Sequence, residues 1–254
     1  MVELWNLIIA NPVLNGLIAL SSILFNSFGL AIIALTIIVR VILLPLTMRQ
    51  LNSTKAMQSM QPKIQELQKK YAKNKEKLQQ EMMKLYKEAG INPLGCIWPM
   101  LVQFPVWIAL YQSIMKALAT TPENLLSLSY HLYSWEVVSQ AIPLNSHFLW
   151  LNLGGQGDLI LAIIVGGTMW VQQKMTTAPS PDPRQQSTSS MMLLMMPLMF
   201  GMFVLMFPSG LALFWVVSNV IGIATQYFIT GGWGYLKPKT SAQLTPVRRS
   251  KTVS

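Results

Sequence analysis

The stretch that decides the fold is "ALTIIVRVILLPLTMRQ", residues 34–50, in which Arg40 interrupts a long apolar run. Residues 28–47 contain 13 residues of the Leu, Ile, Val and Phe type. Together these are worth roughly 5 kcal/mol of membrane-insertion free energy if each has its helix-centre value. A central arginine costs about 2.5–3.5 kcal/mol on the same scale. The segment is therefore predicted to cross a membrane as a helix despite its charge.

The whole chain has the composition of a polytopic membrane protein. Of its 254 residues, 52% are hydrophobic and only 11% are charged. The apolar residues form runs of the length that a bilayer-spanning helix needs. We predict an all-α membrane protein with five transmembrane helices, a cytoplasmic helical hairpin and an N-terminal interfacial helix. The predicted spans are residues 28–47, 97–117, 158–175, 191–207 and 211–230.

The basic residues predict the orientation of these helices. Of the 19 Lys and Arg residues, ten lie within 49–92, two follow the third span and five lie after residue 231, whereas 1–27 and 117–157 have none. Because Lys-rich and Arg-rich loops stay on the cytoplasmic side, we expect the N-terminus outside and the C-terminus in the cytoplasm. The start of the chain, with Glu3 and no basic region, fits neither a signal peptide nor a transit peptide. A bacterial cytoplasmic membrane is the expected location.

The first 26 residues are apolar but broken by polar and helix-breaking residues. They are predicted to form an amphipathic helix in the outer interface. A sixth span is the alternative, which would move the N-terminus inside although the segment has no positive charge to hold it there. The interrupting residues are Asn6, Asn11, Pro12, Asn15, Gly16, Ser21 and Ser22.

The arginine needs a polar environment within its span. None of the nine Asp and Glu residues lies deep in a predicted span, so no carboxylate partner is expected for Arg40. An unpaired guanidinium is tolerated mainly where it faces a hydrated cavity, which predicts water inside the bundle. Thr36, one turn earlier, would extend this polar stripe. The alternatives are that Arg40 caps backbone carbonyls or reaches roughly 10 Å to the cytoplasmic interface near Arg49.

Residues 49–92 combine positive charge with a helical pattern. Apolar residues recur at steps of three and four from Met57 to Tyr71 and from Leu78 to Tyr86. The segment contains ten basic and four acidic residues. We predict an antiparallel helical hairpin that projects into the cytoplasm. It is either a solvated spacer or a docking element for a polypeptide or the ribosome, and its charge favours anionic lipids in both cases.

Three stretches of the chain resemble one protein family. They are "GLAIIALTIIVRVILLPLTMRQLNSTKAMQSMQPKIQELQKKY", "YKEAGINPLGCIWPMLVQFPVWIALY" and "FPSGLALFWVVSNVIGIATQYFI". They are similar, in this order, to the first core span with its hairpin, the second-span signature and the last span of the YidC/Oxa/Alb membrane protein insertases. One departure is "GCIWP" at 95–99, where the usual family pattern is Gly-Gly-Cys-Leu-Pro. The large extracytoplasmic domain of some Gram-negative members is not present, so the resemblance implies a minimal five-span core.

The resemblance implies an insertase and not an enzyme. Members of this family hold a hydrophilic groove in the inner half of the membrane, with an arginine at its floor. A short, often acidic segment of the substrate enters the groove while its apolar helix slides into lipid. The implied partners are nascent membrane proteins, the ribosome and anionic lipids, and participation of the Sec translocon stays open. No cofactor, metal or specific nucleic acid is implied.

Residue by residue, the resemblance places several side chains in the groove. Trp215 is equally interpreted as an apolar packing residue, and Gln173 is an alternative to its neighbour Gln172. Seven Met residues within 191–206 form either an adaptable slide for substrate helices or a plain lipid-facing surface. The implied groove residues are Arg40, Thr36, Trp215, Gln172 and Asn219.

The remaining segments are predicted to be two loops and a tail. Residues 118–157 are predicted to form an outer loop on the interface, and residues 176–190 a cytoplasmic loop. Residues 231–254 are predicted to form a basic cytoplasmic tail. This tail either touches ribosomal RNA or anionic lipid or only anchors the topology.

A small anion transporter or channel that uses Arg40 as an anion site is the alternative function, but the chain has no internal repeat. A passive assembly scaffold would not need a buried charge.

Overall fold

The computed structural model describes residues 2–72, 74–89, 97–118, 128, 130–135, 144–177 and 183–236, and most of them are helical. Parts of the predicted outer loop, cytoplasmic loop and basic tail, and Cys96, lie outside these ranges. The helices are α1 (Val2–Trp5), the π-helical η1 (Asn6–Ala10), α2 (Asn11–Ile23), α3 (Phe28–Ile42), α4 (Leu44–Ser59), α5 (Gln61–Lys70), α6 (Lys75–Glu88), α7 (Ile97–Ala117), α10 (Leu159–Thr176), α11 (Pro183–Val204), α12 (Ser209–Thr230) and the 3-10 helix η3 (Gly234–Leu236). The strands β1 (His147–Phe148) and β2 (Leu151–Asn152) form a small antiparallel ribbon that the sequence did not predict.

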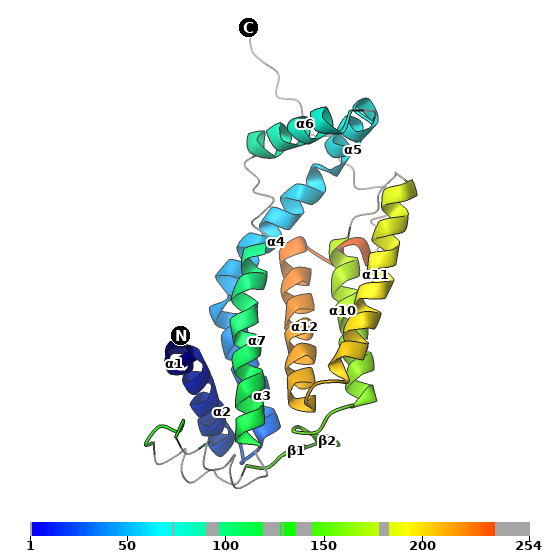
Figure 1. Ribbon diagram of the computed structural model, residues 1–254. Helices are drawn as coiled ribbons and strands as arrows, with labels where there is room; N and C mark the ends of the chain where they lie inside the picture. Colours follow the sequence, from blue (N-terminus) through cyan, green and yellow to red (C-terminus); the bar gives the residue numbers. More distant parts are fainter. Residues whose placement is uncertain are drawn as a thin grey trace.

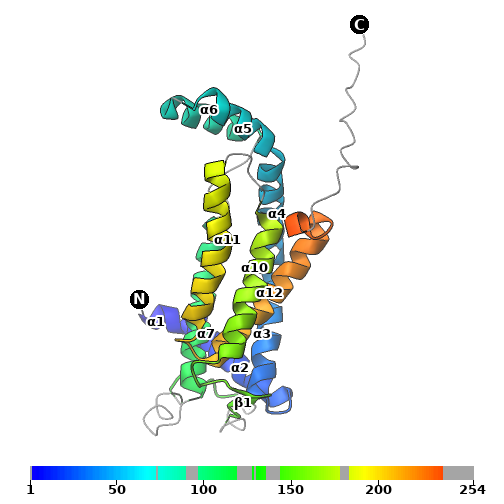
Figure 2. The same ribbon diagram turned by 90° about the vertical axis from the view of Figure 1, so that its right-hand side faces the viewer.

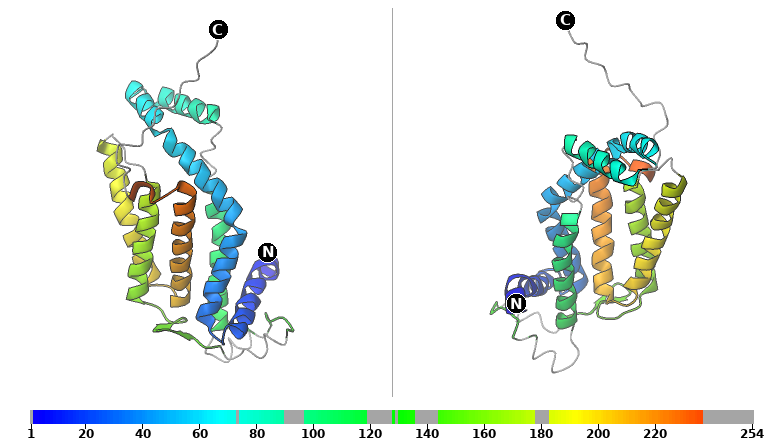
Figure 3. Two further views of the ribbon diagram at one scale, coloured as in Figure 1. Left: turned by 180° about the vertical axis from the view of Figure 1, so that it is seen from behind. Right: turned by 45° about the horizontal axis from the view of Figure 1, so that its top comes forward.

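The long helices form an elongated bundle. Figure 1 shows α7, α12, α10 and α11 upright and side by side, with α5 and α6 lying across one end of the bundle and the β ribbon at the other. Helix α12 is central, because it packs against α3 on one side and α10 on the other, and α10 in turn packs against α11. The views in Figure 3 show the same order. Segments far apart in the sequence therefore share one bundle.

Several helices are long and apolar enough to cross a membrane. Three qualify in the described part of the chain, or four if the bent pair of α3 and α4 is one span. The three are Glu3–Ile23, Gln186–Val204 and Ser209–Ile229. This confirms a mostly helical membrane protein, whereas the count of five spans stays a prediction.

The first predicted span is bent. Helices α3 and α4 meet at Leu43 at an angle of 62°. Pro45 has no N–H to donate to the carbonyl four residues earlier, which weakens the helix at this point. The predicted boundary between span and hairpin, at residues 47–49, falls inside α4, since this helix runs unbroken from Leu44 to Ser59. The chain therefore changes direction at Leu43 and not at the predicted boundary.

The predicted hairpin segment contains the expected helices. Helices α5 and α6 lie against each other, and Asn74 caps α6 by accepting a hydrogen bond from the backbone N–H of Lys77 at 3.0 Å. On the surface of α6, Lys84 donates to Glu81 at 2.8 Å. This hydrogen bond lowers the pKa of the Glu81 carboxyl and raises that of the Lys84 ammonium. Projection of the pair into the cytoplasm stays a prediction.

The N-terminal helices pack on the bundle, and one buried polar residue joins α2 to residues 131 and 133. Helices α1 and α2 are inclined to the upright helices, as Figure 2 shows, and α2 packs against α3 and α7. Asn15 is fully buried: its Nδ2 donates to the carbonyl of His131 at 2.9 Å, and its Oδ1 accepts from the N–H of Tyr133 at 2.7 Å. Asn15 thus ties residues 131 and 133 to α2. Interfacial placement stays a prediction, because the same segment is also long enough to span.

The ribbon end of the bundle is held by backbone hydrogen bonds. The N–H groups of Ser209 and Gly210, at the start of α12, donate to the carbonyls of Gly155 and Leu153 at 2.7 and 2.9 Å. Leu153 is fully buried in the core. The chain between the ribbon and α10 therefore covers this end of the bundle.

A prediction about stability follows from the contact between ribbon and bundle. Gly29 lies in the first turn of α3 directly under the ring of Phe148, and a Cβ there would overlap that ring. Overpacking of this kind costs about 1–3 kcal/mol. We expect Gly29→Ala to lower the thermal unfolding midpoint of the purified protein. The matched control is Gly16→Ala, where a Cβ meets open space and the change is expected to stabilise the helix by about 0.5–1 kcal/mol. A Gly29 variant as stable as wild type would show that Phe148 does not rest on α3.

Candidate functional site

Arg40 lies at the end of α3, in the last helical turn before the bend. A cation is favourable there because the helix C-terminus carries partial negative charge. The side chain is half-buried, and its Nε is buried without a hydrogen-bond partner. Within the described residues, no carboxylate lies beside it in the cavities that it lines. The half-buried guanidinium therefore faces two cavities whose described lining residues supply no counter-ion.

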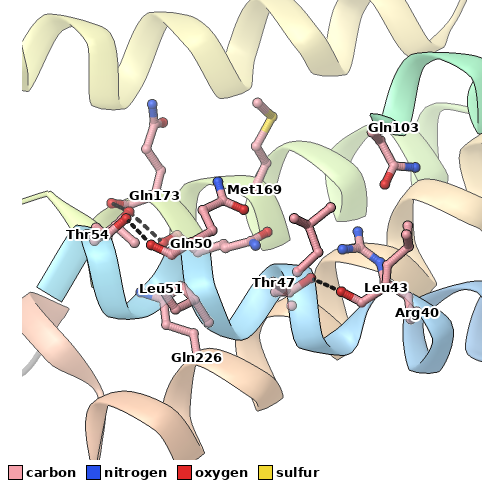
Figure 4. Close-up of a pocket in the computed structure, with 14 residues that line it drawn as sticks. Arg40, Leu43, Thr47, Gln50, Leu51, Thr54, Gln103, Met169, Gln173 and Gln226 are labelled. Carbon is pink, nitrogen blue, oxygen red and sulfur yellow. Dashed lines mark hydrogen bonds between the residues drawn. The ribbon is translucent and has the colours of Figure 1, made fainter. Parts of the chain in front are cut away.

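A polar cavity of about 400 Å³ opens beside Arg40. Figure 4 shows Arg40 and Gln103 at one end of this cavity and Gln173 and Thr54 at the other. Arg40 is the only charged residue among the 14 that line it. The lining residues are Arg40, Leu43, Leu46, Thr47, Gln50, Leu51, Thr54, Gln103, Met169, Gln172, Gln173, Thr176, Gly222 and Gln226.

Helical periodicity explains why these side chains meet. Helix α4 contributes residues spaced three or four apart between Leu46 and Thr54, which lie on one face of the helix, and Leu43 directly precedes α4. The threonines on this face donate their hydroxyls to their own helix, as Thr47 does to the carbonyl of Leu43 at 3.0 Å. Their hydroxyl protons are therefore used within the helix. The groups left to face a ligand are mainly carboxamides and the guanidinium.

A second, aromatic cavity of about 500 Å³ shares one wall with the first. Arg40, Gln103, Met169 and Gln172 line both, so the two cavities adjoin at the arginine. The rest of the second cavity is mostly rings. Its other lining residues are Phe104, Trp107, Phe200, Phe203, Phe214, Trp215, Ser218 and Asn219.

The rings of this cavity form one packed cluster centred on Trp215. This indole stacks on Trp107 with ring centroids 5.9 Å apart and meets Phe200 edge to face at 5.0 Å. Phe203 and Phe207 complete its surroundings at 6.5 and 6.0 Å. The indole of Trp215 therefore packs against other rings and also lines the cavity, so the two interpretations of this residue are compatible.

Four of the five predicted groove residues line a cavity. Arg40 and Gln172 line both, and Trp215 and Asn219 line the aromatic one. Gln173, the alternative to Gln172, also lines the polar cavity. The exception is Thr36, which is buried, donates its hydroxyl to the carbonyl of Ile32 at 2.6 Å and is not part of either lining.

The helix α10 is joined to α12 by polar contacts at the cavity wall. Asn219 donates to the hydroxyl of Thr168 at 3.1 Å. One turn further along α12, the absence of a side chain at Gly222 leaves room for Gln172, whose Nε2 would lie 2.5 Å from a Cβ there. Asn219 thus has a structural role besides its place in the lining.

The site offers no constellation for covalent or metal chemistry in the ranges that the structure covers. No group of three or more His, Cys, Asp or Glu residues is close enough there to hold a metal ion. A cavity with one guanidinium, several carboxamides and aromatic walls can bind by charge, hydrogen bonding and apolar contact. It is suited to a partly acidic and partly apolar ligand.

Comparison with known proteins identifies the family of the chain. The family model described as 60Kd inner membrane protein matches residues 20–233, which is most of the sequence. The chain belongs to this family. Together with the names of the relatives, this match confirms the resemblance to the YidC insertases.

Three of these relatives are each named membrane protein insertase YidC. The protein of Oceanobacillus iheyensis is 38% identical over 225 residues, which are 85% of this chain and 80% of the relative. Those of Histophilus somni and Pasteurella multocida are 38% and 40% identical over 228 and 230 residues, 90% of this chain but only 38% of each relative. The chain therefore spans most of the first relative and well under half of the other two.

Sequence reasoning missed part of the site. Gln50 and Gln103, which line the polar cavity, were assigned no role in the groove, and neither was Gln226. The spacing of Thr47, Gln50 and Thr54 on one helical face is a signal that would have found the α4 wall. Gln103 has no such local signal, because only the packing of α7 against the other helices brings it beside Arg40.

Proposed function

We propose that this chain is a membrane protein insertase. A short hydrophilic segment of a nascent membrane protein enters the polar cavity, where Arg40 attracts its acidic residues. The adjoining aromatic cavity contacts the apolar part of the same substrate and leads it toward lipid. The observation that carries the proposal is that the polar and aromatic cavities meet at one unpaired arginine. The name shared by the relatives supports it.

Binding through one charge suits a passage rather than a permanent complex. Two charges about 4 Å apart attract by about 4 kcal/mol at an effective dielectric constant near 20, and by about 1 kcal/mol in bulk water. This is enough to favour the presence of an acidic segment and weak enough to release it. No covalent step is needed, so the proposal requires no cofactor.

The experiment that tests this function is insertion coupled to crosslinking. The purified chain in proteoliposomes should insert a single-span substrate more efficiently than empty liposomes do. A photoreactive amino acid in place of Gln103, which lines both cavities, should crosslink to the hydrophilic segment of an arrested substrate. The control position is Phe228, which is 80% exposed on α12 and lines neither cavity. Equal crosslinking from both positions would contradict passage through the cavities.

The rival function, small-anion transport, makes a different prediction. An anion site at Arg40 would support movement of chloride or a similar ion across proteoliposomes in the absence of a polypeptide. The names of the relatives do not favour this function. We expect no protein-dependent anion flux.

Several finer features belong to the same proposal. The five-span topology has the N-terminus outside and the C-terminus in the cytoplasm, in a bacterial cytoplasmic membrane. The basic helices α5 and α6 then face the cytoplasm and the anionic lipid surface. Between these helices, the ammonium groups of Lys70 and Lys77 lie 5.5 and 5.8 Å from the centre of the Tyr71 ring. Nascent chains and the ribosome are the proposed partners on that side, and the Sec translocon is a candidate for a shared pathway.

Cysteine labelling tests this topology. In a Cys96→Ser background, we expect Lys84→Cys to react only from the cytoplasmic side and Tyr130→Cys, at a site that is 80% exposed, only from outside. The positive-inside distribution is the physical reason. Leu4→Cys should also react from outside if residues 1–26 lie in the interface, and from the cytoplasm if they form a sixth span. Labelling of Tyr130→Cys from the cytoplasm would contradict the five-span arrangement.

A further inference from the structure

Three glutamine side chains that line the polar cavity have no hydrogen-bond partner within the residues that the structure describes. They are Gln50 on α4, Gln103 on α7 and Gln172 on α10, and each is half-buried. Their amide atoms are not among the buried side-chain atoms that lack a partner, so these atoms remain accessible. A carboxamide has one acceptor oxygen and two N–H donors. The cavity therefore presents free donors and acceptors from three different helices.

The three threonines of the same lining are engaged within the protein. Each donates its hydroxyl to a backbone carbonyl three or four residues earlier, as Thr47 does to Leu43 at 3.0 Å. The carboxamide of Gln172, in contrast, rests where the neighbouring helix has no side chain, since a Cβ at Gly222 would lie 2.5 Å from its Nε2. The carboxamides, and not the hydroxyls, are thus the neutral polar groups of the lining that can bind a ligand.

These carboxamides are spread along the cavity and do not gather at one point. Figure 4 shows Gln103 beside Arg40 at one end of the cavity and Gln50 farther along it. The α4 wall from Leu46 to Thr54 is about 12 Å long, given a rise of about 1.5 Å per residue. An extended polypeptide of about three to four residues has the same length, at about 3.3 Å per residue. The wall therefore suits a short extended chain better than a single small group.

An extended chain inside a membrane needs partners for its peptide groups. Each residue other than proline has one N–H and one C=O, and leaving these groups unpaired away from water is costly. One arginine attracts acidic side chains but cannot pair with a series of peptide groups. A carboxamide is the side chain most similar to a peptide group, because it contains both a donor and an acceptor. It can therefore bind a main chain whatever side chains that chain carries.

We propose that Gln50, Gln103 and Gln172 recognise the main chain of the substrate by hydrogen bonding to the peptide groups of its extended hydrophilic segment. This inference rests on the proposed insertase function and specifies which part of the substrate the polar cavity binds. The main-chain contacts act on acidic and neutral segments alike, whereas Arg40 adds a preference for acidic ones. Substrates of unrelated sequence can therefore share one cavity.

Backbone esters in the substrate test this recognition. In a single-span substrate with a neutral hydrophilic segment, hydroxy acids replace consecutive residues, which turns peptide bonds into esters and keeps the side chains. Each ester lacks the N–H donor. We expect insertion by this chain in proteoliposomes to be about threefold to tenfold less efficient, the effect of about one hydrogen bond.

A cavity that only keeps the segment hydrated predicts the opposite sign. An ester has no N–H to remove from water, so it costs less to transfer out of water than an amide. The ester substrate would then insert as well as the amide substrate or better. Either result would overturn the proposal, and the comparison requires no change in the protein.

Substitution of the glutamines by methionine identifies the side chains involved. The triple variant Gln50→Met, Gln103→Met and Gln172→Met keeps side chains of similar length but removes their donors and acceptors. We expect it to insert the amide substrate as poorly as the ester substrate. The matched control is Gln156→Met, because Gln156 is exposed and lines neither cavity, and it should keep the full preference for the amide. A folded triple variant that still preferred the amide substrate would contradict the assigned residues.

Binding is measured separately from insertion. Fluorescently labelled synthetic versions of the amide and ester substrates are titrated with the wild-type chain in phosphatidylcholine nanodiscs. Tighter binding of the amide substrate without any insertion would refute the proposed function and support the main-chain recognition. Insertion of both substrates with equal efficiency, together with equal affinities, would refute the main-chain recognition and leave the insertase function in place.

Discussion

Arg40→Ala is expected to reduce insertion of single-span substrates with acidic outer segments by about tenfold, which corresponds to a loss of about 1.4 kcal/mol and lies within the attraction of one charge pair. Substrates with neutral segments should be spared. The reason is that Arg40 is the only charged residue among the described residues that line the two cavities, and its buried Nε has no hydrogen-bond partner there. The measurement is the insertion efficiency, in proteoliposomes, of two substrates that differ only in the charge of this segment.

Arg40→Lys separates charge from geometry. If the positive charge attracts the substrate, the lysine variant should keep most of the activity. If the guanidinium instead holds the bundle together through its planar fork, lysine cannot replace it. Both variants would then lose thermal stability, and both substrates would suffer alike. Equal losses with acidic and neutral segments, together with lowered melting temperatures, would rule out Arg40 as the electrostatic attractor.

Trp215→Ala is expected to destabilise the protein by about 3 kcal/mol, the lower end of the usual range for truncation of a large core aromatic side chain, because Trp215 is half-buried. Trp215 contacts four rings. Trp107 belongs to α7, Phe200 and Phe203 belong to α11, and Phe207 lies in the connection between α11 and α12. Inside a membrane, helices associate largely through such packing contacts, so the loss is not offset by lipid. The measurement is thermal unfolding of the purified variant in detergent.

A matched truncation shows whether the effect belongs to the cluster. Trp150→Ala makes the same chemical change at a residue that is 58% exposed, so it should change stability little. Trp215→Phe should retain much of the packing and fall between the two. Similar stabilities of Trp215→Ala and Trp150→Ala would show that Trp215 does not hold α12 to α7 and α11.

The candidate site was predictable in part because some signals are local. Arg40 stands out as a charge within an apolar run, the resemblance of "ALFWVVSN" to the family assigns Trp215, and helical spacing places Asn219 on the same face as Trp215. Thr36 shows the limit of such local reasoning. One helical turn places it near Arg40 in projection, yet neighbouring helices bury it and its hydroxyl bonds to its own backbone. Sharing a face of one helix does not decide what the other helices cover.

The sequence by itself determined that the chain is a helical membrane protein of the insertase family with an arginine inside an apolar helix. Apolar run lengths, loop charges and family motifs are properties of segments, and each can be judged without knowing its neighbours. Only the tertiary structure decided that Gln103 lies beside Arg40, that Asn15 ties the helix α2 to residues 131 and 133, and that the polar cavity adjoins an aromatic one. These features depend on contacts between residues far apart in the sequence, such as Asn15 and His131, which are 116 positions apart. Such contacts exist only after the helices have packed.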